Sequence, residues 1–385
     1  MTASTAFASA ALAAWLYLIV ARGGFWRASV RDDRENAAEP RSWPRVVAVV
    51  PARNEAEVIA ESVGSLLNQD YPGVFAVILV DDQSTDDTAA VGRAAAARAR
   101  APDRLTVLTG QPLPSGWAGK LWAMKQGVDH AASLPEPPRY LLFTDADIAF
   151  SGDALRRLVA RAEAHQFVLT SWMVKLRCES PAERGLIPAF VFFFQMLYPF
   201  AWVNRAGNET AAAAGGCMLV RRDALREAGG IEAIRSSLID DCALGKKLKS
   251  VGPIWLGLTE RAHSLRPYPQ IGDIWRMIAR SAYDQLRYSP VLLIGVAAAM
   301  TLIFLAPPLF ALFGTGLAQL LATLAWVLMA LAFQPMLRFY RVSPLWGVAF
   351  PAIAALYLMF TLDSAYQYAR GRGGLWKGRV QAGRT

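Results

Sequence analysis

The chain has 385 residues, of which 54% are hydrophobic and 18% are charged. This composition is richer in apolar side chains than that of most soluble proteins, and it indicates a membrane portion. The net charge of +9 does not indicate nucleic-acid binding, because many basic residues flank apolar segments and no basic stripe interleaved with aromatic residues runs through the central stretch. The three cysteines, Cys178, Cys217 and Cys242, show no paired or metal-ligand spacing, which fits free thiols in a reducing compartment.

The first expected element is a membrane helix at the N-terminus. Residues 5–21 are almost uncharged and end before Arg22, with no small-residue cleavage signature after them. We therefore expect an uncleaved membrane anchor over residues 1–22 rather than a signal peptide. An arginine-rich linker over residues 23–45 follows, and by the positive-inside rule it places the next domain in the cytosol.

Residues 46–289 read as an α/β domain. Short β-branched runs alternate with helical stretches, which predicts a mainly parallel sheet. Strands are expected at residues 46–50, 75–80, 105–108 and 140–147, and helices near residues 55–68, before residue 100 and over 120–132. The acidic motifs repeatedly follow strand ends, and open α/β sheets bind their ligands at that edge.

Two further apolar regions are expected to meet the membrane. Residues 186–203 are apolar enough to cross a bilayer, but Pro188 and Pro199 interrupt them and soluble halves flank them. We expect an interfacial helix there, with a buried core helix as the alternative. Apolar stretches at 291–313, 317–336 and 345–362 predict C-terminal transmembrane helices within residues 290–369. Three crossings would put the basic tail, residues 370–385, outside, against the positive-inside rule, so one segment can instead be re-entrant or interfacial.

The first two candidate site motifs follow the first two expected strands. The motif PARNE ends in Glu55 near a helix start, where a carboxylate also suits the helix dipole without any function. The motif DDQSTDDT begins with Asp81 and Asp82, which repel each other unless a cation or a hydrogen-bond donor lies between them. A nucleobase N–H or a ribose hydroxyl would satisfy one of these acids, whereas Asp86 is explained as a helix cap.

The motif TDAD contributes two carboxylates, Asp145 and Asp147, at the end of a buried strand. Hard oxygen ligands at this spacing suit Mg²⁺ or Mn²⁺ bridging a diphosphate, although an isolated D-x-D is equally often a solvated turn. Lys120, in GKLWAMKQG, can pair with phosphate, or it can be a solvated lysine at a helix start. His263 is a weaker candidate metal ligand, since a lone histidine is more often structural.

The last acidic motif is IDDCALG, with Asp240 and Asp241 before a lysine-rich helical turn. A helix cap explains one of these acids, Asp240. The second can act as a general base that takes the proton from an acceptor hydroxyl as it attacks an anomeric carbon.

These motifs, together with GGCMLVRRDAL, occur in the order and spacing of family 2 glycosyltransferases with the GT-A fold, and the resemblance covers about residues 46–290. More narrowly, GWAGKLWA, FVFFFQMLYPF and ARSAYDQLRYSP resemble bacterial hopene-associated glycosyltransferases, which are similar to ceramide glucosyltransferases. One departure is that the Q-x-x-R-W motif of processive members is missing, so the resemblance implies addition of a single sugar. Arg280 and Arg287 in this region are either diphosphate ligands or interfacial arginines.

The resemblance implies a role for each motif residue. Glu55 and Asp82 would contact the nucleoside, Lys120 the phosphates, Asp145 and Asp147 the sugar nucleotide and Mg²⁺ or Mn²⁺, and Asp241 would be the base. The implied enzyme is an inverting hexosyltransferase of the bacterial inner membrane that moves a sugar from a nucleotide sugar, UDP-linked, to a lipid such as a hopanoid.

The sequence leaves three alternatives to compare with this function. A polyprenyl phosphate or a carotenoid can replace the lipid acceptor, and the motifs do not separate these enzymes. A degenerate GT-A domain that serves as a membrane-bound assembly partner is disfavoured by the retained acidic motifs. A transporter is disfavoured because residues 291–336 carry no charge.

Overall fold

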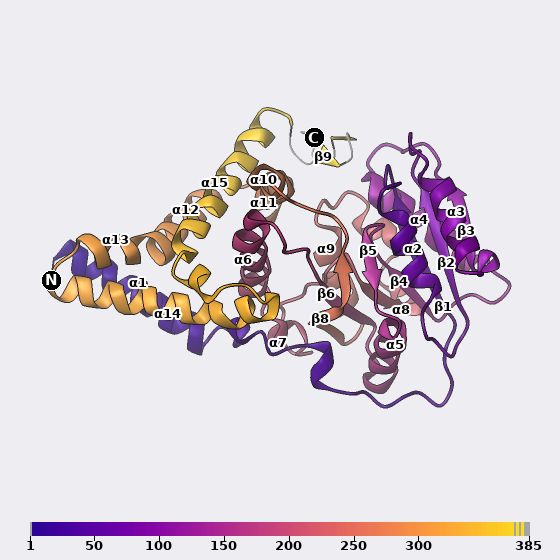
Figure 1. Cartoon of the computed structure of the whole chain (residues 1–385), viewed down its shortest axis with the longest axis horizontal. Helices are drawn as coiled ribbons and strands as arrows, with labels where there is room; N and C mark the ends of the chain where they lie inside the picture. Colours follow the sequence, from indigo (N-terminus) through magenta and orange to yellow (C-terminus); the bar gives the residue numbers. More distant parts are fainter. Residues whose placement is uncertain (1, 373–374, 377–378, 381–385) are drawn as a thin grey trace.

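The computed structural model describes residues 2–372, 375–376 and 379–380. Figure 1 shows an α/β part at one end of the molecule and a group of long helices at the other. The strands are β1 (Val46–Ala52), β2 (Phe75–Asp81), β3 (Leu105–Thr109), β4 (Tyr140–Phe143), β5 (Ile148–Phe150), β6 (Leu169–Lys175), β7 (Met218–Arg221), β8 (Ile254–Ser264), β9 (Leu375–Trp376) and β10 (Arg379–Val380). The other residues of the expected basic tail, 373–374, 377–378 and 381–385, lie outside the described residues.

The helices fall into two groups. Those of the α/β part are α2 (Ile59–Leu67), α3 (Thr88–Arg98), α4 (Gly119–Ala132), α5 (Ala154–His165), α7 (Phe200–Val203), α8 (Arg222–Glu227) and α9 (Asp240–Lys249). Those of the helical part are α1 (Ala3–Val20), α6 (Pro181–Leu197), α10 (Ile271–Ala279), α11 (Ala282–Gln285), α12 (Pro290–Met300), α13 (Ala306–Phe313), α14 (Gly316–Tyr340) and α15 (Phe350–Ala369), with a π-helical turn, Thr301–Leu305, between α12 and α13.

The central sheet has the strand order β3-β2-β1-β4-β7-β6-β8-β5. Its first four strands are parallel, whereas β7 is antiparallel to both β4 and β6, and β5 is antiparallel to β8. Every residue of β1 is buried, as expected for a parallel strand with helices on both faces. Strands occur at the four expected places, but the one expected at 140–147 ends at Phe143. The sheet is mixed because the second half, β5 to β8, adds antiparallel pairs.

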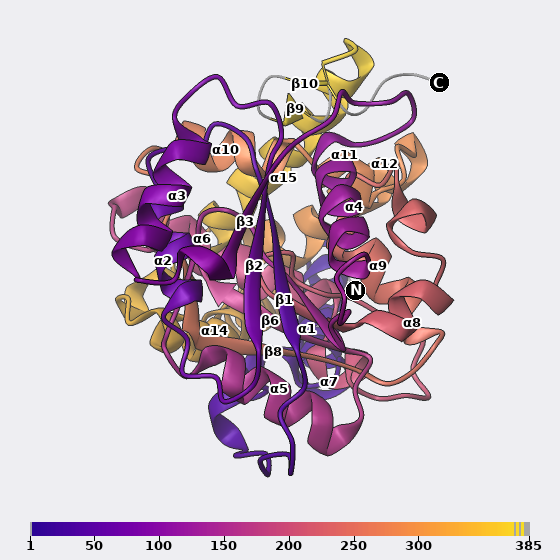
Figure 2. The ribbon, with the colours of Figure 1, turned by 90° about the vertical axis from the view of Figure 1, so that its right-hand side faces the viewer.

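Helices cover both faces of this sheet, and Figure 2 shows α2 and α3 on one side of the strands with α4 on the other. On one face, Ile59, Val63 and Leu66 of α2 are fully buried against the strands. On the other face, α4 comes very close to β1, since an added Cβ at Gly127 would lie 2.4 Å from a methyl group of Val49. This packing fixes the start of α4, and therefore Lys120, at the carboxyl edge of the sheet.

The helical part contains helices whose length and apolar composition would allow them to cross a membrane. Four stretches in the described residues are long and apolar enough to cross one: Ala3–Val20, Pro181–Val203, Pro290–Phe313 and Gly316–Tyr340. Helix α1 packs along α14 through small residues, with Ala8, Ala318 and Ala322 buried together. The Trp15 indole of α1 donates a 2.8 Å hydrogen bond to the carbonyl oxygen of Ile303.

Helices α6 and α15 pack more closely against the rest of the protein than α1, α12 and α14 do, or carry polar side chains. More than half of the most apolar 18 residues of Pro181–Val203 are buried inside the protein, although Leu197, the last residue of α6, is exposed. Helix α15 is not among the four candidate spans, and it carries Asp363 and Ser364. These side chains accept hydrogen bonds from the indole of Trp275 in α10 and from the backbone N–H of Tyr283 in α11.

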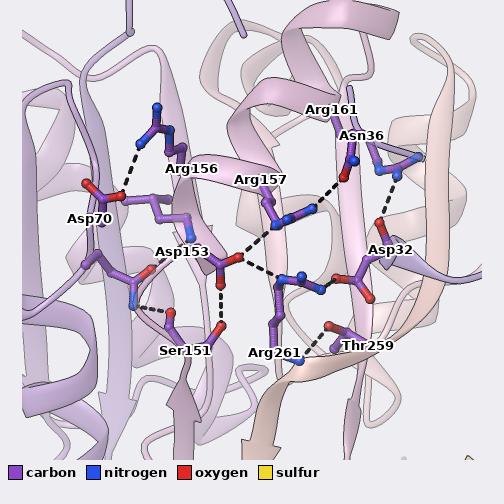
Figure 3. Close-up of polar contacts among 12 residues, drawn as sticks. Asp32, Asn36, Asp70, Ser151, Asp153, Arg156, Arg157, Arg161, Thr259 and Arg261 are labelled. Atoms are coloured by element: carbon purple, nitrogen blue, oxygen red, sulfur yellow. Dashed lines mark hydrogen bonds and ion pairs between the residues drawn. The ribbon is translucent and has the colours of Figure 1, made fainter. Parts of the chain in front are cut away.

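The linker before β1 is held to the α/β part by a buried ionic network (Figure 3). The Asp32 carboxylate, which is almost fully buried, accepts a 2.8 Å bond from Arg261 of β8. Arg261 also donates to Asp153 at 3.0 Å, and Arg161 of α5 donates to the carbonyl oxygens of Asp32 and Glu35. Burial raises the pKa of Asp32 in spite of the neighbouring guanidinium of Arg261. The linker is therefore an ordered part of this domain.

Candidate active site

A cavity of about 670 Å³ opens at the carboxyl edge of the sheet. The ends of β1 and β4, the starts of α4 and α9, and helix α10 surround it. Its walls bring together residues from four of the motifs, among them Glu55, Lys120, Asp145, Asp147 and Asp240, and the basic side chains Arg266, Arg276 and Arg280 also line it. A cavity lined by charged side chains therefore lies at the carboxyl edge of the sheet, where the sequence predicts ligand binding.

Lys120, the second residue of α4, stands between two carboxylates. Its Nζ lies 2.8 Å from Asp145 Oδ1 and 3.0 Å from Asp240 Oδ2. Burial alone would lower the pKa of Lys120, but the carboxylates of Asp145 and Asp240 outweigh burial and raise it. In the same way, Lys120 holds the pKa of Asp145 below its usual value against the effect of burial. The lysine is thus a partly buried, permanent cation and not a solvated one.

Arg266 forms the second cationic centre, and sequence reasoning did not find it. Its Nε donates to Asp147 Oδ2 at 2.8 Å, and its Nη2 lies 2.8 and 2.7 Å from the two carboxylate oxygens of Glu55. Burial and the negative charge of Asp145 nevertheless raise the pKa of Asp147. The only signal in the sequence is an arginine two residues beyond the end of an 11-residue strand, β8.

Asp241 lies next to this cavity and is not among its lining residues. Its two carboxylate oxygens accept hydrogen bonds from the backbone N–H groups of Gly215 and Cys242, at 2.9 and 2.7 Å. Burial, reinforced by the charge of Asp240, raises the pKa of Asp241 to about 6. Gly215 lies close to both charged groups, since an added Cβ there would lie 3.5 Å from Asp241 Oδ2 and 3.3 Å from Lys120 Nζ.

Asp240, the first acid of the pair Asp240–Asp241, does not cap helix α9 as the sequence predicts. Asp240 is the first residue of α9, and the N-cap residue is Ile239, with no side-chain capping bond. The carboxylate of Asp240 is turned to Lys120 and the cavity instead. The helix-cap interpretation of Asp240 is therefore replaced by an ion pair, which the sequence could not show because it depends on how α4 and α9 meet.

Asp82 is fully buried and does not line the cavity. Arg53 Nη1 donates to the carbonyl oxygen of Asp82 and lies 3.9 Å from its Oδ2. The neighbouring loops are tied together, because the N–H of Glu55 donates to Thr88 Oγ1 at 2.8 Å and the N–H of Thr88 donates to Asp86 Oδ1 at 3.1 Å. The contacts of Asp82, Asp86 and Thr88 therefore help to fix the conformation of the loop that carries Glu55.

His263, Arg280 and Arg287, whose roles the sequence does not decide, lie in three different places. His263 is exposed on β8 opposite Ala149, and it does not line the cavity. Arg280 lines the cavity, whereas Arg287 lines a second one. Within the described residues no group of three or more histidine, cysteine or acidic side chains gathers as a metal site.

Comparisons with known proteins identify the family and the fold of the chain. The model of "Glycosyl transferase family 2" matches residues 47–229, and that of "Glycosyl transferase family group 2" matches residues 142–361. No curated protein matches the chain. A mannosyltransferase from Pyrobaculum calidifontis, solved with GDP-Man and Mn²⁺, is 21% identical with a TM-score of 0.58, over 93% of this chain and 99% of that one.

TarS of S. aureus (residues 1–349), solved with UDP-GlcNAc, is 16% identical with a TM-score of 0.40, over 87% of this chain and 95% of that one. The similarity to the mannosyltransferase along almost the whole of both chains confirms the predicted fold class, an α/β domain of the GT-A type with apolar helices near the N-terminus and in the C-terminal region. The family model that covers residues 142–361 extends over more than half of the chain. The chain therefore belongs to glycosyl transferase family group 2, and it is a glycosyltransferase.

Proposed function

We propose that this glycosyltransferase transfers a single sugar, with inversion, from a nucleotide sugar to a membrane lipid. The observation that carries the proposal is the cavity in which Lys120 stands between Asp145 and Asp240, beside a carboxylate of raised pKa at Asp241. The donor bound by the similar mannosyltransferase, GDP-Man, supports a nucleotide sugar here. The sequence resemblance to hopene-associated enzymes favours a UDP-linked donor and a role in hopanoid-associated lipid metabolism.

The donor would lie along the charged floor of the cavity. Lys120 and Arg280 supply positive charge for a diphosphate, and a buried lysine between two acids is held in place for that task. Glu55 would contact the nucleoside directly, because it lines the cavity. Asp82 would act on the nucleoside by supporting the loop that carries Glu55, since it is buried and its backbone is hydrogen bonded to Ala52 and Arg53.

The carboxylates of Asp145 and Asp147 fit a divalent cation. Both face the same cavity, and carboxylates completed by substrate phosphate oxygens are the donor set in which Mg²⁺ is usually held. Mn²⁺ accepts the same hard oxygen ligands. When bound there, the cation would neutralise negative charge on the departing nucleoside diphosphate.

Asp241 would act as the base of the transfer. It takes the proton of the acceptor hydroxyl, the hydroxyl oxygen forms a bond to the anomeric carbon, and the bond from that carbon to the diphosphate breaks. The electron pair of the broken bond leaves with the diphosphate, and direct displacement inverts the configuration. The raised pKa of Asp241, about 6, brings a carboxylate closer to the pH at which a general base works best.

The enzyme would sit in the bacterial inner membrane with its catalytic domain in the cytosol. Helix α1, the pair α12 and α13, and helix α14 supply three crossings. Two C-terminal crossings return the chain to the cytosolic side, where α15 is bound to α10 and α11 through Asp363 and Ser364. This arrangement puts Arg370 and Arg372 in the cytosol, as the positive-inside rule requires.

The test is incubation of the purified protein with a panel of labelled UDP- and GDP-sugars, Mg²⁺ or Mn²⁺, and a total lipid extract. New glycolipids are then identified by mass analysis, and the anomeric configuration of the product is read by NMR. A labelled lipid with the configuration opposite to that of the donor is expected. No product from any donor would count against the function, and a product of retained configuration would count against direct displacement.

A further inference from the structure

A second cavity, of about 430 Å³, lies on the other side of the helix that carries the acidic pair. Asp240 of α9 lines the donor cavity, whereas Ile239, Cys242 and Ala243 line the second one. Asp241 stands between these two sets of residues in the same helical turn. The proposed base therefore belongs to the helical turn that the two cavities share, although it lines neither of them.

Chain segments next to the membrane helices form the rim of the second cavity. Leu197, an exposed lining residue, is the last residue of α6, and its carbonyl oxygen accepts a 3.3 Å bond from Arg22. Arg22 follows α1 directly. On the opposite wall, Arg287 is three residues before Pro290, at which α12 begins. The cavity thus lies at the level where two candidate membrane helices, α1 and α12, meet the catalytic domain.

Neutral hydrogen-bonding groups lie on the side of the cavity nearest to the base. The Tyr198 hydroxyl and the Gln285 side-chain amide are hydrogen bonded, with Tyr198 Oη 2.7 Å from Gln285 Nε2. The Tyr198 hydroxyl also lies near the side chain of Cys242, the residue after Asp241. A hydroxyl group placed beside Tyr198 would therefore be close to Asp241.

The segment 279–290, of which the proposed function uses only Arg280, joins the two cavities. Arg280 lines the donor cavity, and Gln285 lines the second one. Between them, the Asp284 carboxylate lies beside the backbone N–H of Ile239, the residue before the acidic pair. The segment therefore fixes the start of α9 relative to both cavities.

The charges around the second cavity indicate the chemical class of its occupant. Two basic side chains, Lys246 and Arg287, are matched by two acidic ones, Glu209 and Asp284. A site for a phosphate needs an excess of cations or N–H donors, whereas a balanced site suits an uncharged hydroxyl-bearing head. The apolar rim at Leu197 suits the hydrocarbon part of the same molecule.

We infer that the second cavity is the acceptor site and that it takes the uncharged, hydroxyl-bearing head of a membrane lipid alcohol rather than a lipid phosphate. The inference rests on the proposed sugar transfer and adds to it the place and the class of the acceptor. The lipid enters from the membrane side past Leu197, and its hydroxyl reaches Asp241 beside Tyr198.

The first experiment fills the cavity. Ala243→Trp places a large side chain into it, and Lys247→Trp on the exposed side of the same helix is the control. The protein is photolabelled with a fatty alcohol that carries a diazirine beside its hydroxyl, and with the alkyl phosphate of the same chain length. The alcohol is expected to label peptides that contain residues 198, 239–246 or 284–287, and A243W is expected to lose at least about nine-tenths of this label while K247W keeps it. Equal labelling of A243W, or preferential labelling by the phosphate, would overturn the inference.

A second variant covers the case in which A243W does not fold. Tyr198→Phe removes one hydroxyl and should raise the KM for acceptor in the total lipid extract about fivefold, the loss expected for one hydrogen bond, with the Kd for the nucleotide sugar unchanged. An unchanged acceptor KM in Y198F would overturn the assignment. If instead the wild-type protein binds no nucleotide sugar in calorimetry, the proposed function fails, and the photolabelling still decides the nature of the cavity.

Discussion

Arg266 donates a 2.8 Å hydrogen bond from its Nε to Asp147 Oδ2, the carboxylate proposed as a metal ligand. The same guanidinium holds both carboxylate oxygens of Glu55, the residue proposed for the nucleoside. One internal cation thus pairs with two groups that the donor complex would use. Binding of a divalent cation at Asp147 must then displace or share this arginine.

Removal of Arg266 should therefore tighten metal binding. Arg266→Ala leaves Glu55 and Asp147 without their common cation, and the affinity of the donor-free protein for Mn²⁺ is expected to rise about tenfold, since hydrogen bonds to charged groups contribute about 1.5 to 3 kcal/mol. Calorimetry or Mn²⁺ electron paramagnetic resonance measures the change. Arg276→Ala is the matched control, because Arg276 lines the same cavity and pairs with Asp273 instead. An R266A protein that binds Mn²⁺ no more tightly than R276A would show that the arginine does not compete.

The pH dependence of transfer should report the environment of Asp241. Its pKa is raised to about 6 by burial and by the charge of Asp240, and a base works only when deprotonated. Activity is therefore expected to fall as the pH drops through about 6, well above the usual range of an aspartate. Asp240→Asn removes one cause of the raised pKa, so the midpoint of this acidic limb should move to lower pH even though the maximal rate falls.

The rate profiles of the wild type, D240N and the surface variant Asp129→Asn, measured from pH 4.5 to 8, check this expectation. Asp129 pairs with Lys125 on an exposed face of α4 and should leave the midpoint in place. A midpoint that stays the same in D240N would mean that another group limits the rate at low pH.

The parts of the fold that the sequence predicted are those with strong local patterns. The apolar runs at 46–50 and 75–80 are buried parallel strands, and the helix over 120–132 is present within one residue. Strands β6 to β8 were not expected, because their residues alternate less clearly and their pairing joins segments far apart in the chain. The antiparallel insertion of β7 between β4 and β6 is a tertiary feature with no local signal.

The sequence predicts some residues of the candidate site and not others, for the same reason. Lys120 and Asp145 were identified by motif, and the structure brings them together. Arg266 was missed because nothing near it in sequence is acidic, and its partners Glu55 and Asp147 are 211 and 119 residues away. Asp240 was interpreted as a cap because the meeting of α4 and α9, which turns it to Lys120, depends on the packing of the whole domain.

The linker network should contribute to stability. Arg261→Ala leaves the buried Asp32 carboxylate without its cation, and such a change typically costs about 3 to 5 kcal/mol of folding free energy. The unfolding temperature of the detergent-solubilised protein should fall clearly. Arg177→Ala removes the same side chain from an exposed pair with Glu179 and should cost less than about 1 kcal/mol. Equal, small effects of the two substitutions would show that the linker is held by other contacts.

The proposed membrane arrangement predicts which residues are accessible from outside the cell. Thr315, between α13 and α14, should lie outside, and Arg372, after α15, should lie in the cytosol. Intact cells that carry Thr315→Cys or Arg372→Cys are treated with a membrane-impermeant maleimide. Labelling of the first variant alone is expected, and labelling of the second in intact cells would mean that α15 crosses the membrane.

The central claim is that Asp241 takes the acceptor proton during transfer of a sugar to a lipid. Asp241→Asn keeps the size of the side chain and one oxygen for the N–H of Gly215 or Cys242, so that the fold and donor binding should persist. The decisive measurement compares wild type and D241N for the Kd of the nucleotide sugar and for the rate of glycolipid formation with one labelled donor. An unchanged Kd with a rate lowered about a hundredfold or more is predicted from the usual contribution of a general base. A D241N protein that forms glycolipid at the wild-type rate would contradict the account.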